Sequence, residues 1–280
     1  MLSSELPPTS AREGASTRPP WVASAVVGAL RPGDVRVWSA YLDQPPSIAT
    51  HYETLLSPDE RKRAAAFRFP HDRVRYIVRR GILRTILGAY LNADASALSF
   101  AYGPFGKPLI QGPQDYASIR FNVSHRQGMA LYALSRDQDL GVDIEFPHSI
   151  PEADQISERF FSTQENAVFL SLPLHQRQEA FFRCWTRKEA FIKAIGEGFS
   201  FPLHCFDVAF EDGTKSALLS IKGNAERASR WILQDLRPAP NYVGALAIEG
   251  RHWNIRCRHF EPNSDPSANL PLLNFEETNV

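Results

Sequence analysis

Two carboxylates stand two positions apart in residues 140–146 (LGVDIEF). The apolar residues around them predict a β-strand, in which alternate side chains point to the same face. Asp143 and Glu145 should therefore project side by side, while Val142 and Ile144 face a core. Two like charges so placed repel each other unless a positive partner balances them. Two interpretations remain open: a solvated strand edge with salt bridges, or a site for Mg²⁺, which favours one or two carboxylates together with phosphate oxygens.

A third carboxylate lies on a predicted helix within residues 181–198 (FFRCWTRKEAFIKAIGEG). Large apolar residues recur there at three- to four-residue spacing and define a buried face. Glu189 falls on this face, and Lys193 follows it by one turn. A surface pair of Glu and Lys is the commoner outcome of that spacing. The apolar neighbours instead favour a third metal ligand in Glu189 and a phosphate-binding group in Lys193.

A strand end and a turn carry further groups that could bind phosphate. Residues 121–125 (FNVSH) predict a strand that ends on Ser124 and His125, and the Gly/Pro turn at residues 103–108 (GPFGKP) presents Lys107. A turn residue or a solvated lysine is the ordinary interpretation of each. A Ser-His-Asp hydrolase is disfavoured, because adjacent residues of an extended chain point to opposite faces and cannot pair as nucleophile and base. The sequence also contains no GxSxG motif.

A basic helix is predicted at residues 72–84 (DRVRYIVRRGILR). Arg75 and Arg79 share one face of it, and Arg80 and Arg84 share another. A solvated helix surface is the ordinary interpretation, although the forked guanidinium group suits phosphate. The chain has neither a Walker loop nor a GxGxxG motif, which argues against a P-loop or Rossmann nucleotide site.

The elements that would position these residues occur twice along the chain. Capping boxes at residues 57–60 (SPDE) and 162–165 (STQE) are 162 − 57 = 105 residues apart. Each precedes a short helix and a longer one, expected at 61–67 and 72–90 and then at 165–170 and 175–195. Strand-like runs are expected at 35–42, 98–102, 121–124, 129–134, 206–210, 217–221, 231–234 and 242–248. This pattern predicts an α+β fold of two similar halves, with a ligand-binding cleft between them.

Composition limits the class of protein. Lys plus Arg and Asp plus Glu number 31 each, and 43% of residues are hydrophobic, as in an ordinary soluble domain without a general affinity for nucleic acid or membrane. The three cysteines lack CxxC spacing and fit a reducing, cytoplasmic setting. The apolar run at residues 21–30 is too short to span a membrane. We expect disordered tails at residues 1–20 and 261–280, an N-terminal α+β half at 21–138 and a C-terminal α+β half at 139–260.

In this order the motifs resemble those of the Sfp-type 4′-phosphopantetheinyl transferases: DxxR, GKP, FNVSH, GVDIE and WTRKEAFIKAIGEG. The resemblance extends from about Ser57 to Phe210. It implies a pseudo-duplicated, two-half monomer that holds coenzyme A and Mg²⁺ (or Mn²⁺) in the cleft between its halves. It also implies transfer of the 4′-phosphopantetheine arm to a serine of an apo acyl or peptidyl carrier protein, with release of 3′,5′-ADP. Such carriers serve fatty acid, polyketide or nonribosomal peptide synthesis.

The resemblance also implies roles for individual residues at the reacting phosphates. Asp143, Glu145 and Glu189 match the metal ligands, and Lys193 matches the residue on the pyrophosphate. Glu189 is in addition the best candidate to accept the proton of the attacking serine hydroxyl. The expected catalytic residues are therefore Asp143, Glu189 and Lys193.

A second set of residues matches those that bind the nucleotide end of coenzyme A. Ser124 and His125 match contacts of the 3′-phosphorylated nucleotide, and Lys107 and Arg75 match neighbouring contacts. Arg63 falls where relatives tend to carry a basic residue near the 3′-phosphate. Some relatives are also basic at the position of Glu60, and this acidic residue is therefore left outside the expected site.

Two other functions are compatible with parts of the pattern. One is a different Mg²⁺-dependent enzyme that cleaves phosphate or pyrophosphate and shares only the carboxylates. The other is a catalytically inactive module that binds coenzyme A, which would be expected to lose Asp143, Glu189 or Lys193. All three residues are present. The sequence leaves open which carrier protein is used.

Overall fold

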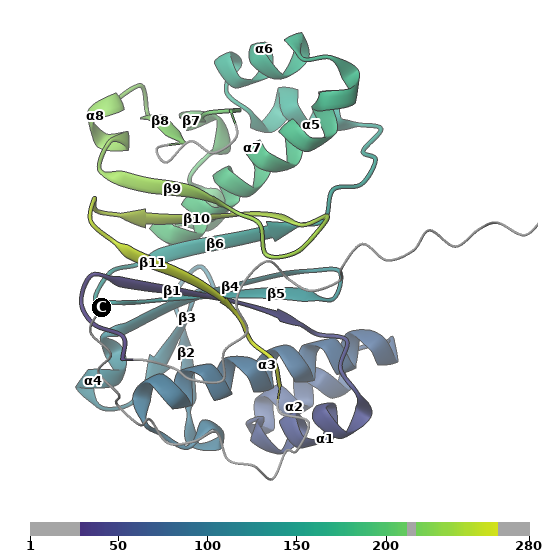
Figure 1. Ribbon diagram of the computed structural model, residues 1–280, viewed down its shortest axis with the longest axis vertical. Helices are drawn as coiled ribbons and strands as arrows, with labels where there is room; N and C mark the ends of the chain where they lie inside the picture. Colours follow the sequence, from purple (N-terminus) through teal and green to yellow (C-terminus); the bar gives the residue numbers. More distant parts are fainter. Residues whose placement is uncertain (1–28, 212–216, 263–280) are drawn as a thin grey trace, which may run out of the picture.

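The computed structural model describes residues 29–211 and 217–262 of the 280-residue chain. Most of the two expected tails, 1–20 and 261–280, lies outside the described residues. The described part is layered, with the two main sheets, one from each half, packed together in the centre and the long helices α3 (Pro70–Leu91) and α7 (Leu174–Ile195) on the outer faces (Figure 1).

The first half contains five strands and one long helix, α3. In chain order its elements are β1 (Asp34–Tyr41), α1 (Pro46–Leu55), α2 (Pro58–Ala65), α3 (Pro70–Leu91), the 3₁₀ turn η1 (Ala95–Ala97), β2 (Ser99–Tyr102), β3 (Pro108–Gln111), α4 (Gln114–Ala117), β4 (Ile119–Arg126) and β5 (Met129–Arg136). The two expected helices and four expected strands are confirmed to within a few residues. Helices α1 and α4 and strand β3 were not predicted.

The second half repeats the order of a short helix, a long helix and strands. Its elements are β6 (Leu140–Glu145), α5 (Ala153–Phe160), α6 (Thr163–Ser171), α7 (Leu174–Ile195), the 3₁₀ turns η2 (Gly198–Ser200) and η3 (Leu203–Cys205), β7 (Phe206–Val208), β8 (Leu218–Ile221), α8 (Ala225–Ala228), β9 (Trp231–Leu236), β10 (Val243–Glu249) and β11 (Asn254–His259). The pseudo-duplicated α+β architecture is confirmed. Helices α5 and α8 and strand β11 were not predicted.

The last strand returns to the first half. The four-stranded sheet has the order β11-β1-β5-β4, and the three-stranded sheet has the order β6-β10-β9. Strand β11 pairs in parallel with β1, from Asp34 opposite Asn254 to Ser39 opposite His259. The C-terminal strand therefore belongs in space to the N-terminal sheet, although the expected division of the chain placed it with residues 139–260.

The alternation of side chains between the two faces of each strand explains how the layers form. In β5, Leu131 faces the second sheet, and its neighbour Tyr132 faces the helical core of the first half; both are fully buried. An apolar layer from both sheets fills the space between them, and we call it the inter-sheet layer. Its buried members are Val35, Val37, Met129, Leu131, Ala133, Leu140, Val142, Ile144, Leu236, Ala239, Leu246 and Ile248. Helix α7 packs on the other face of the second sheet, against β6 and β10.

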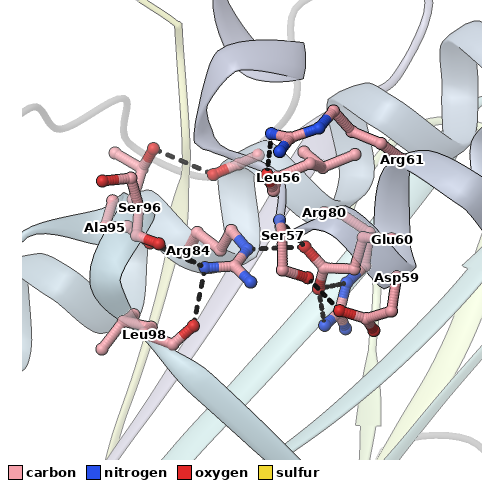
Figure 2. Close-up of polar contacts among 12 residues, drawn as sticks. Leu56, Ser57, Asp59, Glu60, Arg61, Arg80, Arg84, Ala95, Ser96 and Leu98 are labelled. Atoms are coloured by element: carbon pink, nitrogen blue, oxygen red, sulfur yellow. Dashed lines mark hydrogen bonds and ion pairs between the residues drawn. The ribbon is translucent and has the colours of Figure 1, made fainter.

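A buried ion pair beneath the long helix also occurs in both halves. In the first, Glu60 of the α2 capping box accepts hydrogen bonds from Arg80 and Arg84 of α3 (Figure 2). In the second, Glu165 of the α6 capping box pairs with Lys188 of α7 at 2.7 Å. Arg84 and Lys188 hold the same place in their 22-residue helices, since 84 − 70 = 188 − 174 = 14.

Each of these two cations also binds the chain that follows its helix. Arg84 donates to the carbonyl oxygens of Ala95 and Leu98, each at 2.9 Å, at the first residue of the turn η1 and directly after it. Lys188 donates to those of Leu203 and Phe206, at 2.8 and 2.7 Å, around η3. The duplication therefore extends to the polar contacts that lock each long helix to its sheet. None of the described helices is long and apolar enough to cross a membrane.

Candidate active site between the two halves

Strand β6 directs its two carboxylates at helix α7. Val142 and Ile144 are buried in the inter-sheet layer, so Asp143 and Glu145 point to the opposite face, as predicted. Gly141 allows the helix to approach, because a Cβ there would lie 2.1 Å from the Ala190 carbonyl oxygen and 2.4 Å from the backbone nitrogen of Ala194. A glycine at this position thus brings the carboxylates within reach of the last turns of α7.

Lys193 joins the two halves at Asp143. Its ammonium group lies 2.5 Å from Asp143 Oδ1 and donates to Ser124 Oγ at 3.1 Å. The Ser124 hydroxyl in turn donates to Asp143 Oδ1 at 2.9 Å. Ser124 lies on β4 of the first half, whereas the other two residues belong to the second. The expected location of the site between the halves agrees with this contact.

A second carboxylate–cation contact lies beside the first. Glu145 Oε2 is 3.0 Å from Arg126 Nε, again across the two halves. Nearby, Asn122 Oδ1 accepts the backbone N–H of Val142 at 2.9 Å and ties β4 to β6. The sequence analysis missed both Arg126 and Asn122. The only sequence signal for them was their position, since Asn122 lies within the FNVSH strand and Arg126 directly follows it.

Three carboxylates close together make this region electrostatically unbalanced. Burial, followed by the charge of Asp143, raises the pKa of Glu145, although Arg126 and Lys193 oppose this. Burial and the charges of Asp143 and Glu145 likewise raise the pKa of Glu189 to about 7, against the opposing effect of Lys193. The charges of Asp143 and Glu145 thus act on Glu189, and its role as a third metal ligand stays a prediction.

The donor set fits a hard cation in its chemistry, but the ligands are not assembled around one point. Asp143 Oδ2 and Glu189 Oε1 are buried and have no hydrogen-bond partner, which leaves two carboxylate oxygens available. Within residues 29–211 and 217–262, however, no three His, Cys, Asp or Glu side chains are arranged to hold a metal ion. Asp143 is turned to Lys193 and Glu145 to Arg126, and a metal would require these side chains to reorient. The assignment of the three ligands stays a prediction.

The residues expected to bind the nucleotide end of coenzyme A fall into two groups: some are exposed to solvent, and others already contact carboxylates. His125 is exposed at the end of β4, yet the surrounding protein and the cations Arg79, Lys193 and Arg126 lower its pKa to about 4. Arg63 is exposed on α2, and its guanidinium carbon lies 5.7 Å from the centre of the Tyr76 ring. Both are open to a ligand.

Lys107 and Arg75, in contrast, already have partners. Lys107 Nζ lies 2.9 Å from Asp139 Oδ1 and 3.3 Å from the Ala194 carbonyl oxygen in the last turn of α7. Arg75 makes a forked ion pair with Asp43, at 2.6 and 2.8 Å. Their roles in binding coenzyme A stay predictions, and each would require an existing contact to be exchanged.

The buried ion pairs show that the Arg80 and Arg84 face of the basic helix is neither a solvated surface nor a phosphate-binding surface. Arg80 and Arg84 neither face solvent nor point to a ligand, because both are buried around Glu60 (Figure 2). Burial alone would raise the pKa of Glu60, and the two guanidinium groups reverse this and hold it below its usual value. The acidic residue excluded from the expected site is thus part of a structural contact.

A pocket of about 770 Å³ lies beyond the end of β6. It begins at Phe146 and Pro147, directly after Glu145, and includes Tyr242 and Gln178. None of the residues that the sequence assigned to the site lines it.

Comparison with known proteins identifies the family from both halves. A sequence model described as "4′-phosphopantetheinyl transferase, N-terminal" matches residues 45–136, and one for the 4′-phosphopantetheinyl transferase superfamily matches residues 139–247. The 4′-phosphopantetheinyl transferase HetI of Nostoc sp. is 36% identical over 227 residues, covering 81% of this chain and 92% of the relative. The 4′-phosphopantetheinyl transferase Sfp of Bacillus subtilis is 29% identical over 185 residues, covering 65% and 80%.

A mammalian relative also matches along most of the chain. The L-aminoadipate-semialdehyde dehydrogenase-phosphopantetheinyl transferase of Rattus norvegicus is 28% identical over 242 residues, covering 79% of this chain and 77% of the relative. The chain belongs to the 4′-phosphopantetheinyl transferase superfamily. The resemblance seen in the motifs is therefore confirmed.

Proposed function

We propose that this protein transfers the 4′-phosphopantetheine arm of coenzyme A to a serine of an apo acyl or peptidyl carrier protein, with release of 3′,5′-ADP. The observation that carries the proposal is the contact of Ser124, Asp143 and Lys193 across the two halves, on a chain that belongs to this superfamily. One chain supplies both sides of the contact, which supports a monomer as the active form.

The residues between the halves have complementary tasks in this reaction. Phosphoryl transfer requires mainly positioning and neutralisation of charge on the oxygens. Lys193 supplies a positive charge where the pyrophosphate would lie, and Ser124 supplies a hydroxyl beside it. Glu189 is our candidate to accept the proton of the carrier serine, because its buried Oε1 has no hydrogen-bond partner.

Asp143, Glu145 and Glu189 would hold Mg²⁺, with Mn²⁺ as an alternative. When bound, the metal supplies positive charge to the phosphate oxygens and orients them. Lys193 would then exchange its contact with Asp143 for one with the pyrophosphate. Arg126 would be released from Glu145 in the same way.

The direct test is to incubate the protein with coenzyme A, Mg²⁺ and several apo carrier proteins and to measure each carrier by intact mass spectrometry. We expect a mass gain of one phosphopantetheine group on at least one carrier, together with 3′,5′-ADP in the supernatant. Phosphate products without a modified carrier would instead indicate a hydrolase. No modification of any carrier by the folded protein would reject the proposal.

Two variants test the carboxylate assignment. Asp143→Asn and Glu189→Gln should each lower turnover by about 100-fold or more, because each removes charge stabilisation from the reacting phosphates. Circular dichroism and the melting temperature should stay close to those of the wild type. Glu226→Gln is the control, since Glu226 is exposed on α8 and pairs with Arg230, another exposed residue. Near wild-type turnover of either site variant at saturating Mg²⁺ would show that its residue is not a metal ligand.

A further inference from the structure

The turn between β4 and β5 lies at the boundary between the two halves. It consists of Gln127 and Gly128, since Arg126 and Met129 are the last paired residues of the hairpin. Both turn residues have a positive φ, 40° at Gln127 and 82° at Gly128. Such a backbone suits glycine but costs free energy at a residue with a side chain. The surroundings of Gln127 must therefore hold it in this conformation.

On the side of the first half, an ion pair packs against the turn. Arg75 donates from Nε and Nη2 to the two carboxylate oxygens of Asp43, at 2.6 and 2.8 Å. A Cβ on Gly128 would lie 2.5 Å from Asp43 Oδ2 and 3.2 Å from Arg75 Nη2, so the glycine allows the pair to touch the backbone. The Leu42 N–H also donates to the Gly128 carbonyl oxygen at 2.8 Å. The first half thus fixes one side of the turn.

On the side of the second half, Tyr242 holds the same turn. Its hydroxyl donates to the Gln127 carbonyl oxygen at 2.7 Å, and its ring packs edge-on against Phe146 at 5.1 Å between ring centres. Phe146 directly follows Glu145, and Val243, the residue after Tyr242, is the partner of Glu145 in the pairing of β10 with β6. Tyr242 therefore ties the turn to the end of β6 that carries a carboxylate of the candidate site.

The turn also sets the position of Arg126. This residue directly precedes the turn, and its Nε lies 3.0 Å from Glu145 Oε2 across the two halves. A displaced turn would therefore shift a contact at the candidate site. Chemical steps are sensitive to such shifts, since a misplacement of about 1 Å can slow a reaction by about 100-fold.

We propose that Arg75 is a positioning residue, which acts on the site through the β4–β5 turn together with Asp43 and Tyr242 and does not itself contact coenzyme A. We call these three residues the turn clamp. The inference rests on the proposed function and differs from the role that the sequence resemblance implies for Arg75. Asp43 already takes two of the donors that a forked phosphate contact would use. Moving Arg75 to a ligand would leave Asp43 against the turn without its cation.

The test is a double-mutant cycle of Asp43→Asn, Arg75→Gln and the double variant. Each single variant should lower kcat/KM for carrier modification by about 5- to 20-fold, and the double variant should lose no more than either one, because both act through the same turn. Affinity for coenzyme A, measured by isothermal titration calorimetry, should change by less than about threefold, since no ligand contact is removed. Arg73→Gln, which breaks the pair of α3 with Glu53, should behave as the wild type.

Hydrogen–deuterium exchange of the free protein tests the turn clamp directly. Tyr242→Phe keeps the ring that packs on Phe146 and removes only the hydroxyl. It should speed exchange of the backbone amides at residues 126–129 by about 2- to 10-fold, the effect expected for loss of one hydrogen bond. Asp43→Asn should act in the same direction. Unchanged exchange in both variants would overturn the inference.

Two results of the cycle would also overturn it. A loss of coenzyme A affinity in Arg75→Gln that Asp43→Asn does not share would show that Arg75 contacts the ligand. Losses that multiply in the double variant would show that the two residues act separately. A wild type that modifies no carrier would refute the proposed function, whereas the exchange and affinity measurements would still decide the role of Arg75.

Discussion

Lys193 shows why two carboxylates can be tolerated on the buried strand β6. Its ammonium group neutralises Asp143 at 2.5 Å, and Arg126 does the same for Glu145 at 3.0 Å. Both cations can leave when a better partner arrives, because neither is fully buried. The site thus has its counter-charges in place before coenzyme A binds, and we expect the phosphates to compete for them.

His125 should behave as a neutral hydrogen-bonding group near neutral pH. With a pKa of about 4 in place of the ordinary value near 6.5, its imidazole should titrate at the acid end of an NMR series that follows the ring protons from pH 7 to pH 4. Addition of 3′,5′-ADP should move the midpoint upward, because a nearby phosphate favours the charged ring. Comparison with His125→Gln assigns the signal. A midpoint above about 6 in the free protein would contradict the positive surroundings described for this residue.

The same shift has a consequence for stability. Between about pH 6.5 and pH 4 the unfolded chain binds a proton at His125 that the folded chain does not, so the free energy of unfolding should decrease as the pH falls through this range. His125→Gln should show a smaller decrease between pH 7 and pH 5 in urea denaturation. The exposure of the ring makes this a modest contribution.

At the scale of elements, a buried ion pair at the same position holds each of the two long helices, with a different cation in each half. In each half a glutamate of a capping box lies under the fifteenth residue of a 22-residue helix, which is Arg84 in one and Lys188 in the other. The first half adds Arg80 to the pair, and its two guanidinium groups also stack on Phe100. The second half adds a hydrogen bond of 2.7 Å from the Val208 backbone to Glu165. The first arrangement concentrates more positive charge on one carboxylate.

Glu60→Gln should therefore destabilise the protein strongly. Removal of this charge leaves two buried guanidinium groups without a counter-ion, and we expect the free energy of unfolding to fall by about 3–5 kcal/mol. Urea denaturation at pH 7 measures the change. Glu53→Gln is the matched control, since its exposed pair with Arg73 should contribute only about 0–1 kcal/mol. A loss in Glu60→Gln no larger than that of the control would show that Arg80 and Arg84 find other partners.

At the scale of the whole molecule, two features join the halves. The inter-sheet layer draws its buried side chains from both sheets, and β11 carries the end of the second half into the sheet of the first. Beside β11, Phe260 packs edge-on against Trp38 at 6.3 Å between ring centres. The halves are therefore expected to unfold together, although each has a core of its own.

Leu131→Ala tests this coupling. The side chain is fully buried in the inter-sheet layer, and its truncation should lower the free energy of unfolding by about 2–5 kcal/mol. Circular dichroism and tryptophan fluorescence should still report one transition with the same midpoint. Leu219→Ala, at a leucine that is 46% exposed, should change stability by less than about 0.5 kcal/mol. Separate midpoints for the two probes would show that the halves unfold independently.

Much of the fold could be predicted because its signals are local. A capping box, an apolar helix face and the alternation of a strand depend on residues within a few positions of one another. This is why the long helices, the orientation of Asp143 and Glu145 and the duplication were all accessible from sequence. The pairing of β11 with β1 was not, because it joins residues more than 200 positions apart without a local pattern.

The sequence by itself thus determined the family, the two-half plan and the small group of residues that could handle phosphate. Only the tertiary structure decided which of these charged side chains are already paired with another group of the protein. It places Arg80 and Arg84 on Glu60, Arg75 on Asp43, and Lys107 at the end of α7, and it leaves Arg79 without an acidic partner among the described residues. The physical reason is that an arginine has the same charge in every context. Its role is set by the acids that the fold brings within about 4 Å of it, often from another element of the chain.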